Sequence, residues 1–443
     1  MDLVHAALAA VDPFAAVCRF LRLDPAGSEL RVGDGPPVDL RLVDRVVVVG
    51  AGKASVAMAS GVESILGPDR IAAGAVIAKA GQVAARARAL PEIVQVHEAA
   101  HPVPDRSSVE STEKVLSLLG GLTRDDLVLA LISGGGSSLM TSPVASVDLF
   151  DLEALGALLL ASGISIDGVN AVRKHLDRVK GGQLAAAAAP ARVVSLILSD
   201  VVGNPIDVIA SGPTAPDPTT FSDALEVLER VRPGLDGVPE SVQRWLREGV
   251  EGRHAETPKP GEPLFDRVRN QIVGSNELAA EAAHRRAREL GFNAWILSTS
   301  VEGEAREVGR VYAALLREVA ARGRPVARPA CLVLGGETTV TLREDPGRGG
   351  RNQELALSAA LALEGLPDVM VVALATDGND GPTDAGGALV DGTTSARGRR
   401  AGLDPRAHLH RNDAYPFFEA LDDLIEIGPT GTNVNDLTLL LAF

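Results

Sequence analysis

The stretch Val46-Val-Val-Val-Gly50-Ala-Gly52-Lys53-Ala-Ser55 decides the fold class of the first part of the chain. Its valines are apolar on both faces, as in a buried parallel strand, and its glycines predict a tight turn into a helix. Such a turn lets backbone amides and the charge of Lys53 approach an anion. Neither a Walker A motif nor a dinucleotide fingerprint is complete, because Val47 and Ser55 stand where these motifs need glycine. A purely structural turn is therefore an alternative.

Short apolar runs of the same kind recur along the chain, with helix-like segments between them. In those segments, such as 223–232 and 277–290, apolar residues lie three and four positions apart, as on a helix that covers a sheet. This alternation predicts an α/β protein, and 443 residues suffice for two such domains. The expected strands lie at 46–49, 75–78, 127–132, 193–198, 294–297, 332–334 and 369–375.

A segment rich in proline, glycine and charged residues, 236–264, predicts a linker between the two domains. We therefore expect a larger N-terminal α/β domain with a mainly parallel sheet over 1–235, and a smaller α/β domain over 265–443. Doubly wound sheets bind ligands beyond the carboxyl ends of their strands. The turns at those ends are the places where chemistry is expected.

Composition excludes several classes of protein. Apolar residues make up 46% of the chain and charged residues 23%, as in ordinary globular proteins. The net charge of −15 and the absence of a run of basic residues in the sequence argue against electrostatic binding of nucleic acid or of an anionic membrane. No apolar run approaches the ~20 residues that span a bilayer, and two cysteines cannot form a disulfide framework. We expect a cytoplasmic protein that binds neither nucleic acid nor membrane.

A second glycine turn, which follows the expected strand 127–132, is the strongest candidate for binding phosphate. Three consecutive glycines leave backbone amides accessible, and three serine hydroxyls flank them, which suits phosphate oxygens. A flexible loop is the alternative interpretation. The residues of this predicted phosphate loop are Ser133, Gly134, Gly135, Gly136, Ser137 and Ser138.

Charged residues between 170 and 200 form two further candidates. Arg173 and Lys174 lie on an expected helix, where they could bind an anion or simply face solvent. Asp200 follows the expected strand 193–198, so its carboxylate could serve a metal or a hydroxyl group, or cap the next helix.

The second half of the chain contributes acids and one cation. Glu337 ends an expected strand, and Arg351 opens an expected helix after a glycine-rich loop. Asp377 and Asp380 lie in a turn whose carboxylate oxygens suit Mg²⁺, although an ordinary Asp/Asn/Gly turn is the alternative. Asn435, in an Asn- and Thr-rich segment near the C-terminus, is a candidate ligand contact.

Together these groups match what phosphoryl transfer requires. That reaction needs a metal on the phosphates, cations on the moving charge and a positioned nucleophile, and little covalent participation by the protein. No Ser-His-Asp order and no cysteine at a glycine turn stand out, so acyl transfer is poorly supported.

The chain resembles the class II glycerate 2-kinases, whose C-terminal part is called the MOFRL domain. The resemblance runs nearly end to end and rests on nine motifs in the same order. They are Gly50-Ala-Gly-Lys-Ala-Ser, Leu131-Ile-Ser-Gly-Gly-Gly-Ser-Ser-Leu, Asn170-Ala-Val-Arg-Lys-His-Leu, Lys180-Gly-Gly-Gln-Leu, Ser199-Asp-Val-Val-Gly, Ala210-Ser-Gly-Pro-Thr, Gly335-Gly-Glu-Thr-Thr, Gly350-Arg-Asn-Gln-Glu and Thr376-Asp-Gly-Asn-Asp-Gly.

The resemblance implies ATP-dependent phosphorylation of D-glycerate at its 2-hydroxyl, giving 2-phosphoglycerate and ADP, with Mg²⁺ or another divalent cation. It also implies a Rossmann-like N-terminal domain, a MOFRL-type C-terminal domain and an active-site cleft between them. The partner is then a small molecule, and the sequence leaves open whether the protein is a homo-oligomer.

The resemblance implies that Lys53 and Arg351 are catalytic, and we assign the finer roles of the candidate residues, as hypotheses, from their charge and chemistry. Lys53 and Arg351 are the expected catalytic cations, and Asp200 orients or deprotonates the acceptor hydroxyl. Arg173 or Lys174 clamps the glycerate carboxylate. Asp377 and Asp380 are the metal candidates, and the residues expected to contact substrate or nucleotide are Gly50, Gly52, the predicted phosphate loop, Glu337 and Asn435.

Two other functions stay open at this point. A hydroxypyruvate reductase would need a nicotinamide site, which Ser55 in the third glycine position and Lys79 in place of an acid argue against. A non-catalytic sensor of sugar acids or nucleotides would use the same glycine turns, but anion binding alone would not place carboxylates nearby.

Overall fold

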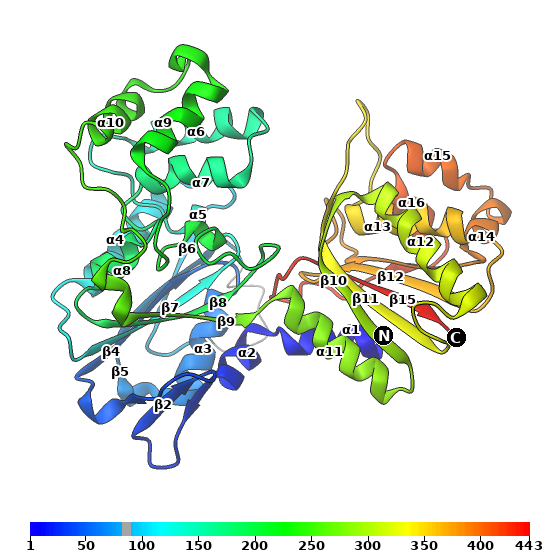
Figure 1. Cartoon of the computed structure of the whole chain (residues 1–443), viewed down its shortest axis with the longest axis horizontal. Helices are drawn as coiled ribbons and strands as arrows, with labels where there is room; N and C mark the ends of the chain where they lie inside the picture. The colour runs from blue at the N-terminus through cyan, green and yellow to red at the C-terminus, as the bar shows by residue number, and fades with distance from the viewer. Residues whose placement is uncertain (82–89) are drawn as a thin grey trace. The chain divides into compact units, whose positions relative to one another are not determined.

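The computed structural model describes residues 1–81 and 90–443, and they divide into two compact units. The N-terminal unit consists of Pro13–Ser199 and Asn204–Val273, and the C-terminal unit of Met1–Asp12, Asp200–Gly203 and Gly274–Phe443. Each unit is built on its own six-stranded sheet with helices beside it (Figure 1). The predicted α/β class with two α/β domains is confirmed.

The sheet of the N-terminal unit is of the doubly wound kind. Its strand order is β6-β5-β4-β7-β8-β9, and the pairings of β4 with β5 and β7, of β5 with β6 and of β7 with β8 are parallel. All eight residues of β7 are buried, which explains its uninterrupted apolar run. The strands are β4 (Arg45–Ala51), β5 (Ile71–Lys79), β6 (Gln95–Ala99), β7 (Asp126–Ser133), β8 (Arg192–Leu198) and β9 (Val268–Gly274).

The order of these strands reverses between β4 and β7. The chain moves outward from β4 to β5 and β6, then crosses back to β7 and on to β8. Because parallel crossovers are right-handed, the helices of the two directions cover opposite faces of the sheet. The covering helices are α3 (Ser55–Leu66), α4 (Arg106–Leu119) and α8 (Gln183–Ala188), and α2 (Pro13–Phe20) packs against α3. Ligands of such sheets bind at the carboxyl ends beside the reversal, where the two glycine turns lie.

A separate helix layer of the N-terminal unit has its own apolar core beyond the end of the sheet (Figure 1). It contains α6 (Leu149–Ala161), α7 (Ile166–His175), α9 (Phe221–Val231) and α10 (Glu240–Val250). The predicted linker 236–264 contains α10, whose Val242 and Leu246 are fully buried in this core. The chain passes from this unit to the other after Val273, because β9 still belongs to the first sheet.

The C-terminal unit has a mixed sheet of order β10-β11-β15-β12-β13-β14. Strands β10 and β11 pair in parallel, and the other neighbouring strands pair antiparallel. In particular, β15 runs antiparallel to both β11 and β12. The strands are β10 (Asn293–Glu304), β11 (Ala330–Thr339), β12 (Val369–Ala375), β13 (Gly387–Asp391), β14 (Leu424–Ile425) and β15 (Asp436–Ala442). The central strand β15 comes from the end of the chain.

Helices lie on both faces of this second sheet (Figure 1). On one face, α1 packs along α11, and an ion pair of 3.1 Å joins Asp2 to Arg286, so residues 1–12 belong with the C-terminal unit. The helices are α1 (Asp2–Ala10), α11 (Asn276–Glu289), α12 (Ala305–Arg322), α13 (Arg351–Leu363), α14 (Thr394–Arg400), α15 (Pro405–His410) and α16 (Ala414–Glu419).

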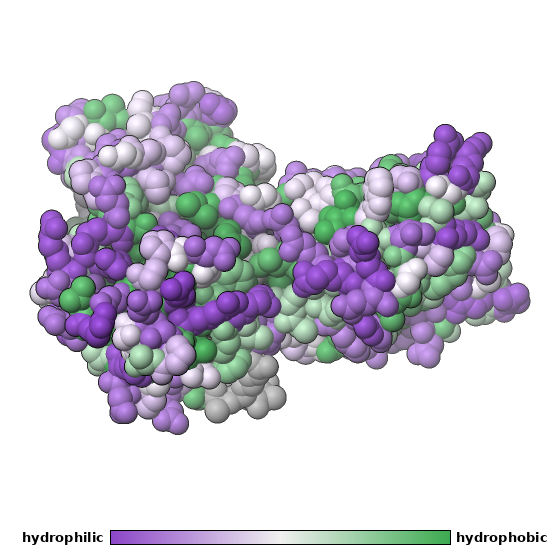
Figure 2. Space-filling model, turned by 60° about the horizontal axis from the view of Figure 1, so that its bottom comes forward, coloured by the Kyte–Doolittle hydropathy of each residue, from purple (hydrophilic) through white to green (hydrophobic). Residues whose placement is uncertain are grey.

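Hydrophilic side chains cover most of the face seen in Figure 2, with apolar ones in small groups between them. Within 1–81 and 90–443, no single helix has both the length and the apolar character needed to cross a membrane. The bent pair α1 and α2 meets that test only when the two helices are counted together, by length and composition.

Candidate functional site

The two predicted glycine turns are bonded to each other at the carboxyl end of the parallel sheet. The amide of Lys53 donates to the carbonyl of Gly134 at 2.9 Å, and that of Ala54 donates to Ser133 Oγ at 3.0 Å. A β-carbon on Gly52 would lie 2.1 Å from Ser133 Oγ, and one on Gly50 would lie 2.2 Å from the Leu131 carbonyl oxygen. These glycines are therefore required for the close approach of β4 and β7, which fixes Lys53 beside the predicted phosphate loop.

His101 adds an imidazole to this end of the sheet, which sequence reasoning missed. A β-carbon on Gly135, whose φ is +81°, would lie 3.0 Å from the His101 ring and 3.6 Å from Lys53 Cγ. Burial, together with the charges of Lys53 and Lys79, lowers the pKa of His101 to about 4. The imidazole is thus neutral at pH 7, so the positive charge beside the predicted phosphate loop comes from lysine and not from histidine.

The Ser137 hydroxyl of the predicted phosphate loop is held by a turn from another part of the chain. Ser137 Oγ lies 2.7 Å from Ser211 Oγ, and the Ser211 hydroxyl donates to Asn170 Oδ1 at 2.9 Å. Ala210 and Ser211 have φ of 51° and 61°, in the left-handed region that non-glycine residues rarely adopt. This strained turn packs against Gly136, where a β-carbon would lie 2.9 Å from Ala210 Cβ. It positions the Ser137 hydroxyl.

Beside the predicted phosphate loop lies a cavity of about 320 Å³, entirely within the N-terminal unit. The helix α6 forms one wall, and the segments 102–104, 137–141 and 173–180 form the others. Its lining residues are Pro102, Val103, Pro104, Ser137, Ser138, Thr141, Leu152, Glu153, Leu155, Gly156, Ala157, Leu159, Leu160, Arg173, Leu176, Asp177 and Lys180.

Arg173 and Lys174 have different surroundings although they are neighbours on α7. Arg173 lines the cavity, and its guanidinium has no ion pair with any residue in 1–81 or 90–443. Burial alone lowers the pKa of Arg173. Lys174 is buried and forms ion pairs with Asp217 at 3.2 Å and with Asp207 at 3.7 Å. Of the two, Arg173 is the cation that a ligand could reach.

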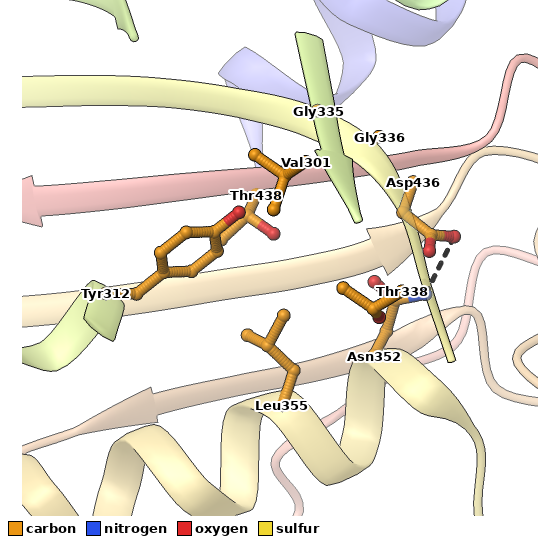
Figure 3. A pocket seen from close by; sticks show the side chains of 9 residues that line it. All are labelled: Val301, Tyr312, Gly335, Gly336, Thr338, Asn352, Leu355, Asp436 and Thr438. Atoms are coloured by element: carbon orange, nitrogen blue, oxygen red, sulfur yellow. Dashed lines mark hydrogen bonds between the residues drawn. The ribbon is translucent and has the colours of Figure 1, made fainter. Parts of the chain in front are cut away.

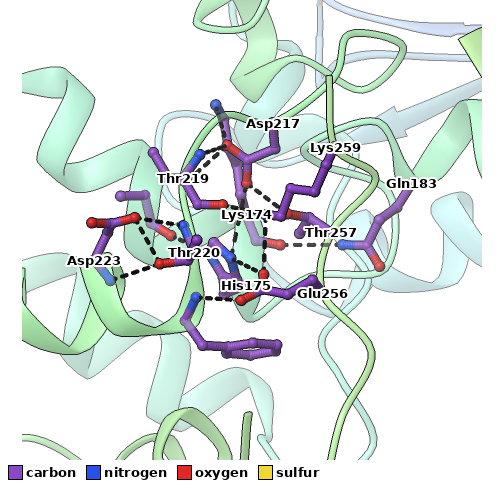
Figure 4. Close-up of polar contacts among 12 residues, drawn as sticks. Lys174, His175, Gln183, Asp217, Thr219, Thr220, Asp223, Glu256, Thr257 and Lys259 are labelled. Atoms are coloured by element: carbon purple, nitrogen blue, oxygen red, sulfur yellow. Dashed lines mark hydrogen bonds and ion pairs between the residues drawn. The ribbon is translucent and has the colours of Figure 1, made fainter. Parts of the chain in front are cut away.

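The carboxylate of Asp217 organises the polar contacts beneath α7 (Figure 4). It accepts hydrogen bonds from Lys174 Nζ at 3.2 Å and from the hydroxyls of Thr219 and Thr257 at 2.8 Å. The nearby His175 Nε2 lies 3.0 Å from Glu256 Oε2. These contacts attach the segment around residue 256 to α7, which explains why the predicted linker is part of this unit.

We expect Asp217→Ala to lower the free energy of unfolding by about 3–5 kcal/mol, because the ammonium of Lys174 would lose its buried partner. Urea unfolding measures this loss. Glu226→Ala is the control, since it breaks the exposed Arg230–Glu226 pair of 3.0 Å and should cost at most about 1 kcal/mol. Equal losses in the two variants would contradict the importance given to the buried pair.

In the C-terminal unit, Arg351 is held by two acids from the ends of strands. Its Nε and Nη2 donate to the two carboxylate oxygens of Asp436 at 2.6 and 3.0 Å, and its Nη1 donates to Glu337 Oε1 at 2.7 Å. Burial opposes the charge of Arg351, but the hydrogen bonds and charge of Asp436 outweigh it and raise the pKa of the guanidinium. Sequence reasoning named Arg351 and Glu337 and missed Asp436.

Close packing surrounds Asp436. Figure 3 shows its hydrogen bond with Asn352, whose Nδ2 donates to Asp436 Oδ1 at 3.0 Å, next to a cavity of about 10 Å³. A β-carbon on Gly335 would lie 1.7 Å from Asn276 Oδ1, and one on Gly336 would lie 2.1 Å from the Val301 carbonyl oxygen. The glycine pair within β11 therefore allows neighbouring chain segments to approach closely, and these segments fill the space that a ligand would need.

Asn435 stabilises the turn that leads into β15. Its carbonyl oxygen accepts hydrogen bonds from the amide and the hydroxyl of Thr376, at 3.1 and 2.7 Å, and its φ is +66°. This fixes the start of β15 and so the position of Asp436. Asp200, the remaining predicted acid, lies just after β8 and is half-buried.

The two predicted metal ligands differ in how their oxygens are used. Asp380 is buried, and its carboxylate accepts from the amides of Asn352 and Gln353 at 3.1 and 2.9 Å, in the first turn of α13. Asp377 is half-buried, and its Oδ1 accepts from the amide of Asn379 at 3.0 Å. In the part of the chain that the structure describes, no three His, Cys, Asp or Glu side chains are grouped so that they could hold a metal. A metal here would need oxygens from a ligand.

Burial raises the pKa of Asp380 from 3.8 to about 7, and the charge of Asp436 adds to the rise. In the folded protein the carboxyl group thus binds a proton between about pH 4 and pH 7, where the unfolded chain has lost it. We expect this group to stabilise the fold below pH 4 and to lose that contribution as the pH rises to 7. The slope is up to about 1.4 kcal/mol per pH unit.

Urea unfolding of the wild type and of Asp380→Asn between pH 4.5 and 7.5 tests this expectation. The variant is expected to be less stable throughout, because its amide group cannot accept from both backbone amides, and to have a flatter pH dependence. Parallel pH profiles for the two proteins would show that Asp380 does not titrate in this range.

Two family models match different parts of the chain. Residues 1–247 match the family described as a domain of unknown function, DUF4147, and residues 330–436 match the MOFRL family. The chain is 44% identical to D-glycerate 2-kinase of Thermotoga maritima over 90% of each chain. It is 40% identical to glycerate 2-kinase of Pyrococcus horikoshii, over 100% of this chain and 96% of that protein.

A crystal structure of glycerate kinase from Thermotoga maritima matches the whole chain. The TM-score is 0.87 and the identity 42%, with 100% of this chain and 98% of that chain covered. A relative from Agrobacterium vitis, 45% identical over 98% of this chain and 92% of that protein, bears a provisional name as a hydroxypyruvate reductase. Identity at this level over nearly the full length shows that the chain belongs to the glycerate 2-kinase family.

Proposed function

We propose that the chain transfers the terminal phosphoryl group of ATP to the 2-hydroxyl of D-glycerate, giving 2-phosphoglycerate and ADP. The observation that carries this proposal is the pair of glycine turns at the strand-order reversal, with Lys53 fixed beside the phosphate loop. A cation there can meet the charge that spreads over the phosphoryl oxygens during transfer. The names of the relatives support the same reaction.

We propose distinct roles for three residues in this reaction. Asp200 accepts the proton of the 2-hydroxyl, whose oxygen then bonds to phosphorus as the bond to ADP breaks. Lys53 and Arg351 stabilise the charge on the transferring group. The hydrogen bonds from Glu337 and Asp436 fix the guanidinium of Arg351, so little reorganisation is needed when charge develops.

We propose that Mg²⁺ binds together with the nucleotide, as is usual for kinases, where phosphate oxygens complete its coordination. Asp377 suits this task better than Asp380, whose two oxygens already accept hydrogen bonds from the backbone of α13. The ion would neutralise phosphate charge. We also propose a cytoplasmic location, where ATP is present and where the two cysteines, Cys18 and Cys331, which form no disulfide with each other, stay reduced.

The test is an assay of ADP formation with ATP, Mg²⁺ and D-glycerate, followed by identification of the product by ³¹P NMR. We expect 2-phosphoglycerate. Absence of ADP, or formation of 3-phosphoglycerate, would refute the proposal. Titration with NADH and NADPH in the presence of hydroxypyruvate examines the reductase alternative, which requires nicotinamide oxidation.

A further inference from the structure

The cavity of about 320 Å³ in the N-terminal unit has one strongly apolar wall. The helix α6 lines it with Leu152, Leu155, Leu159 and Leu160, and Glu153 is the only charged residue that this wall contributes. D-Glycerate carries a hydroxyl or a carboxyl group on every carbon, so it cannot make use of such a wall. A flat heterocyclic base can pack against such a wall, because it buries its apolar faces there while its polar edge stays accessible.

The opposite side of the cavity is polar and carries the positive charge of Arg173, which forms no ion pair with the described residues, 1–81 and 90–443. Ser137 and Ser138 of the phosphate loop line it, as does Arg173. Lys180 also lies there, but Asp177 neutralises it, and its ammonium donates further hydrogen bonds to the Met140 carbonyl and to Thr141 Oγ1 at 3.2 Å. The guanidinium of Arg173 is therefore the cation on this side that an added anion could neutralise.

We propose that this cavity is the nucleoside pocket of the enzyme. The base lies against the leucines of α6, and the phosphates extend toward Ser137, Ser138 and Arg173. The volume lies within the range of about 300–1,000 Å³ that is usual for small-molecule sites. This inference rests on the proposed kinase function, and it assigns Arg173 to the nucleotide rather than to the carboxylate of glycerate.

Gly156 offers a test that leaves the helix intact. It lies on α6 and lines the cavity, and a β-carbon built there meets no atom within 4 Å. Leucine favours helix more than glycine does, so Gly156→Leu fills the cavity without weakening α6. Ala154→Leu is the matched control, since it adds an apolar side chain at an exposed position of the same helix that does not line the cavity.

We expect Gly156→Leu to raise the Kd for ADP, measured by calorimetry, and the KM for ATP by about tenfold or more. The KM for D-glycerate should stay within about twofold, and Ala154→Leu should change none of these constants by more than that. Ala157→Phe, at an exposed position that also lines the cavity, is expected to act in the same direction if Gly156→Leu does not fold.

Unchanged nucleotide affinity in both cavity variants, or a rise in the KM for D-glycerate alone, would overturn the proposal. Failure of the kinase assay would refute the proposed function. The ADP titrations would still test whether the cavity binds the nucleoside. Wild-type protein that binds no ADP would overturn the nucleoside pocket directly.

Discussion

An Arg351→Ala variant is expected to lose about a hundredfold to a thousandfold in kcat, the usual effect of removing a fixed donor from developing charge. The guanidinium is fixed before the reaction by three hydrogen bonds of 2.6–3.0 Å to Glu337 and Asp436. Such a cation stabilises the transition state more than the bound substrate, so kcat should fall more than KM rises. Steady-state kinetics with varied ATP and D-glycerate measure both constants.

The same substitution also affects stability, which must be separated from catalysis. The side chain of Asp436 is 8% exposed, and without Arg351 its carboxylate loses its charged partner, at a cost of about 3–5 kcal/mol. Adding Asp436→Asn removes that unpaired charge. We expect the double variant Arg351→Ala/Asp436→Asn to regain part of the lost stability in urea and none of the lost kcat.

Arg351→Lys is the conservative control for this experiment. Lysine keeps the charge but cannot donate to both oxygens of Asp436 in the planar geometry of a guanidinium. We expect an intermediate kcat and a smaller loss of stability than in Arg351→Ala. A kcat within a few-fold of wild type in the alanine variant would remove Arg351 from the mechanism.

The glycine turns and part of the strands could be predicted because their causes are local. The predicted strands correspond to β4, β5, β7, β8, β10, β11 and β12, whereas β6, β9, β13, β14 and β15 were not predicted. A strand buried on both faces must be apolar throughout, as β7 is, so its residues identify it. Gly50 and Gly52 are required by the packing of β4 against β7. The glycines therefore predicted the position of the turn correctly. The sequence alone does not show whether a glycine is needed for packing between strands or for binding phosphate.

The unpredicted parts depend on contacts between distant segments. A single histidine such as His101 cannot be assigned to a site from the sequence, because its position follows from the pairing of β6 with β5. Arg173 and Lys174 are equivalent in the sequence, and only the packing of α7 decides which one faces the cavity. Asp380 has the residue type of a metal ligand, but the start of α13 lies where its carboxylate caps the helix.

Lys53→Met is expected to lower kcat by about a hundredfold or more, because a positioned cation at the phosphoryl group is lost. Methionine keeps most of the length and the apolar stem of lysine, and the backbone bond from residue 53 to Gly134 does not depend on the side chain. Steady-state kinetics measure kcat, and urea unfolding of the same variant shows whether the loss of activity comes with a loss of stability.

His101 reports whether Lys53 carries its charge in the place described. The pKa of His101 is about 4 because of burial and then because of the charges of Lys53 and Lys79. Of the two lysines, Lys53 lowers the pKa of His101 more. Its replacement by methionine removes a positive charge that disfavours the imidazolium, so the pKa of His101 should rise in Lys53→Met. NMR titration of the imidazole measures it. Lys79→Met should raise this pKa by less and leave kcat within a few-fold. An unchanged titration together with normal kcat in Lys53→Met would show that this lysine does not act at the carboxyl end of the sheet.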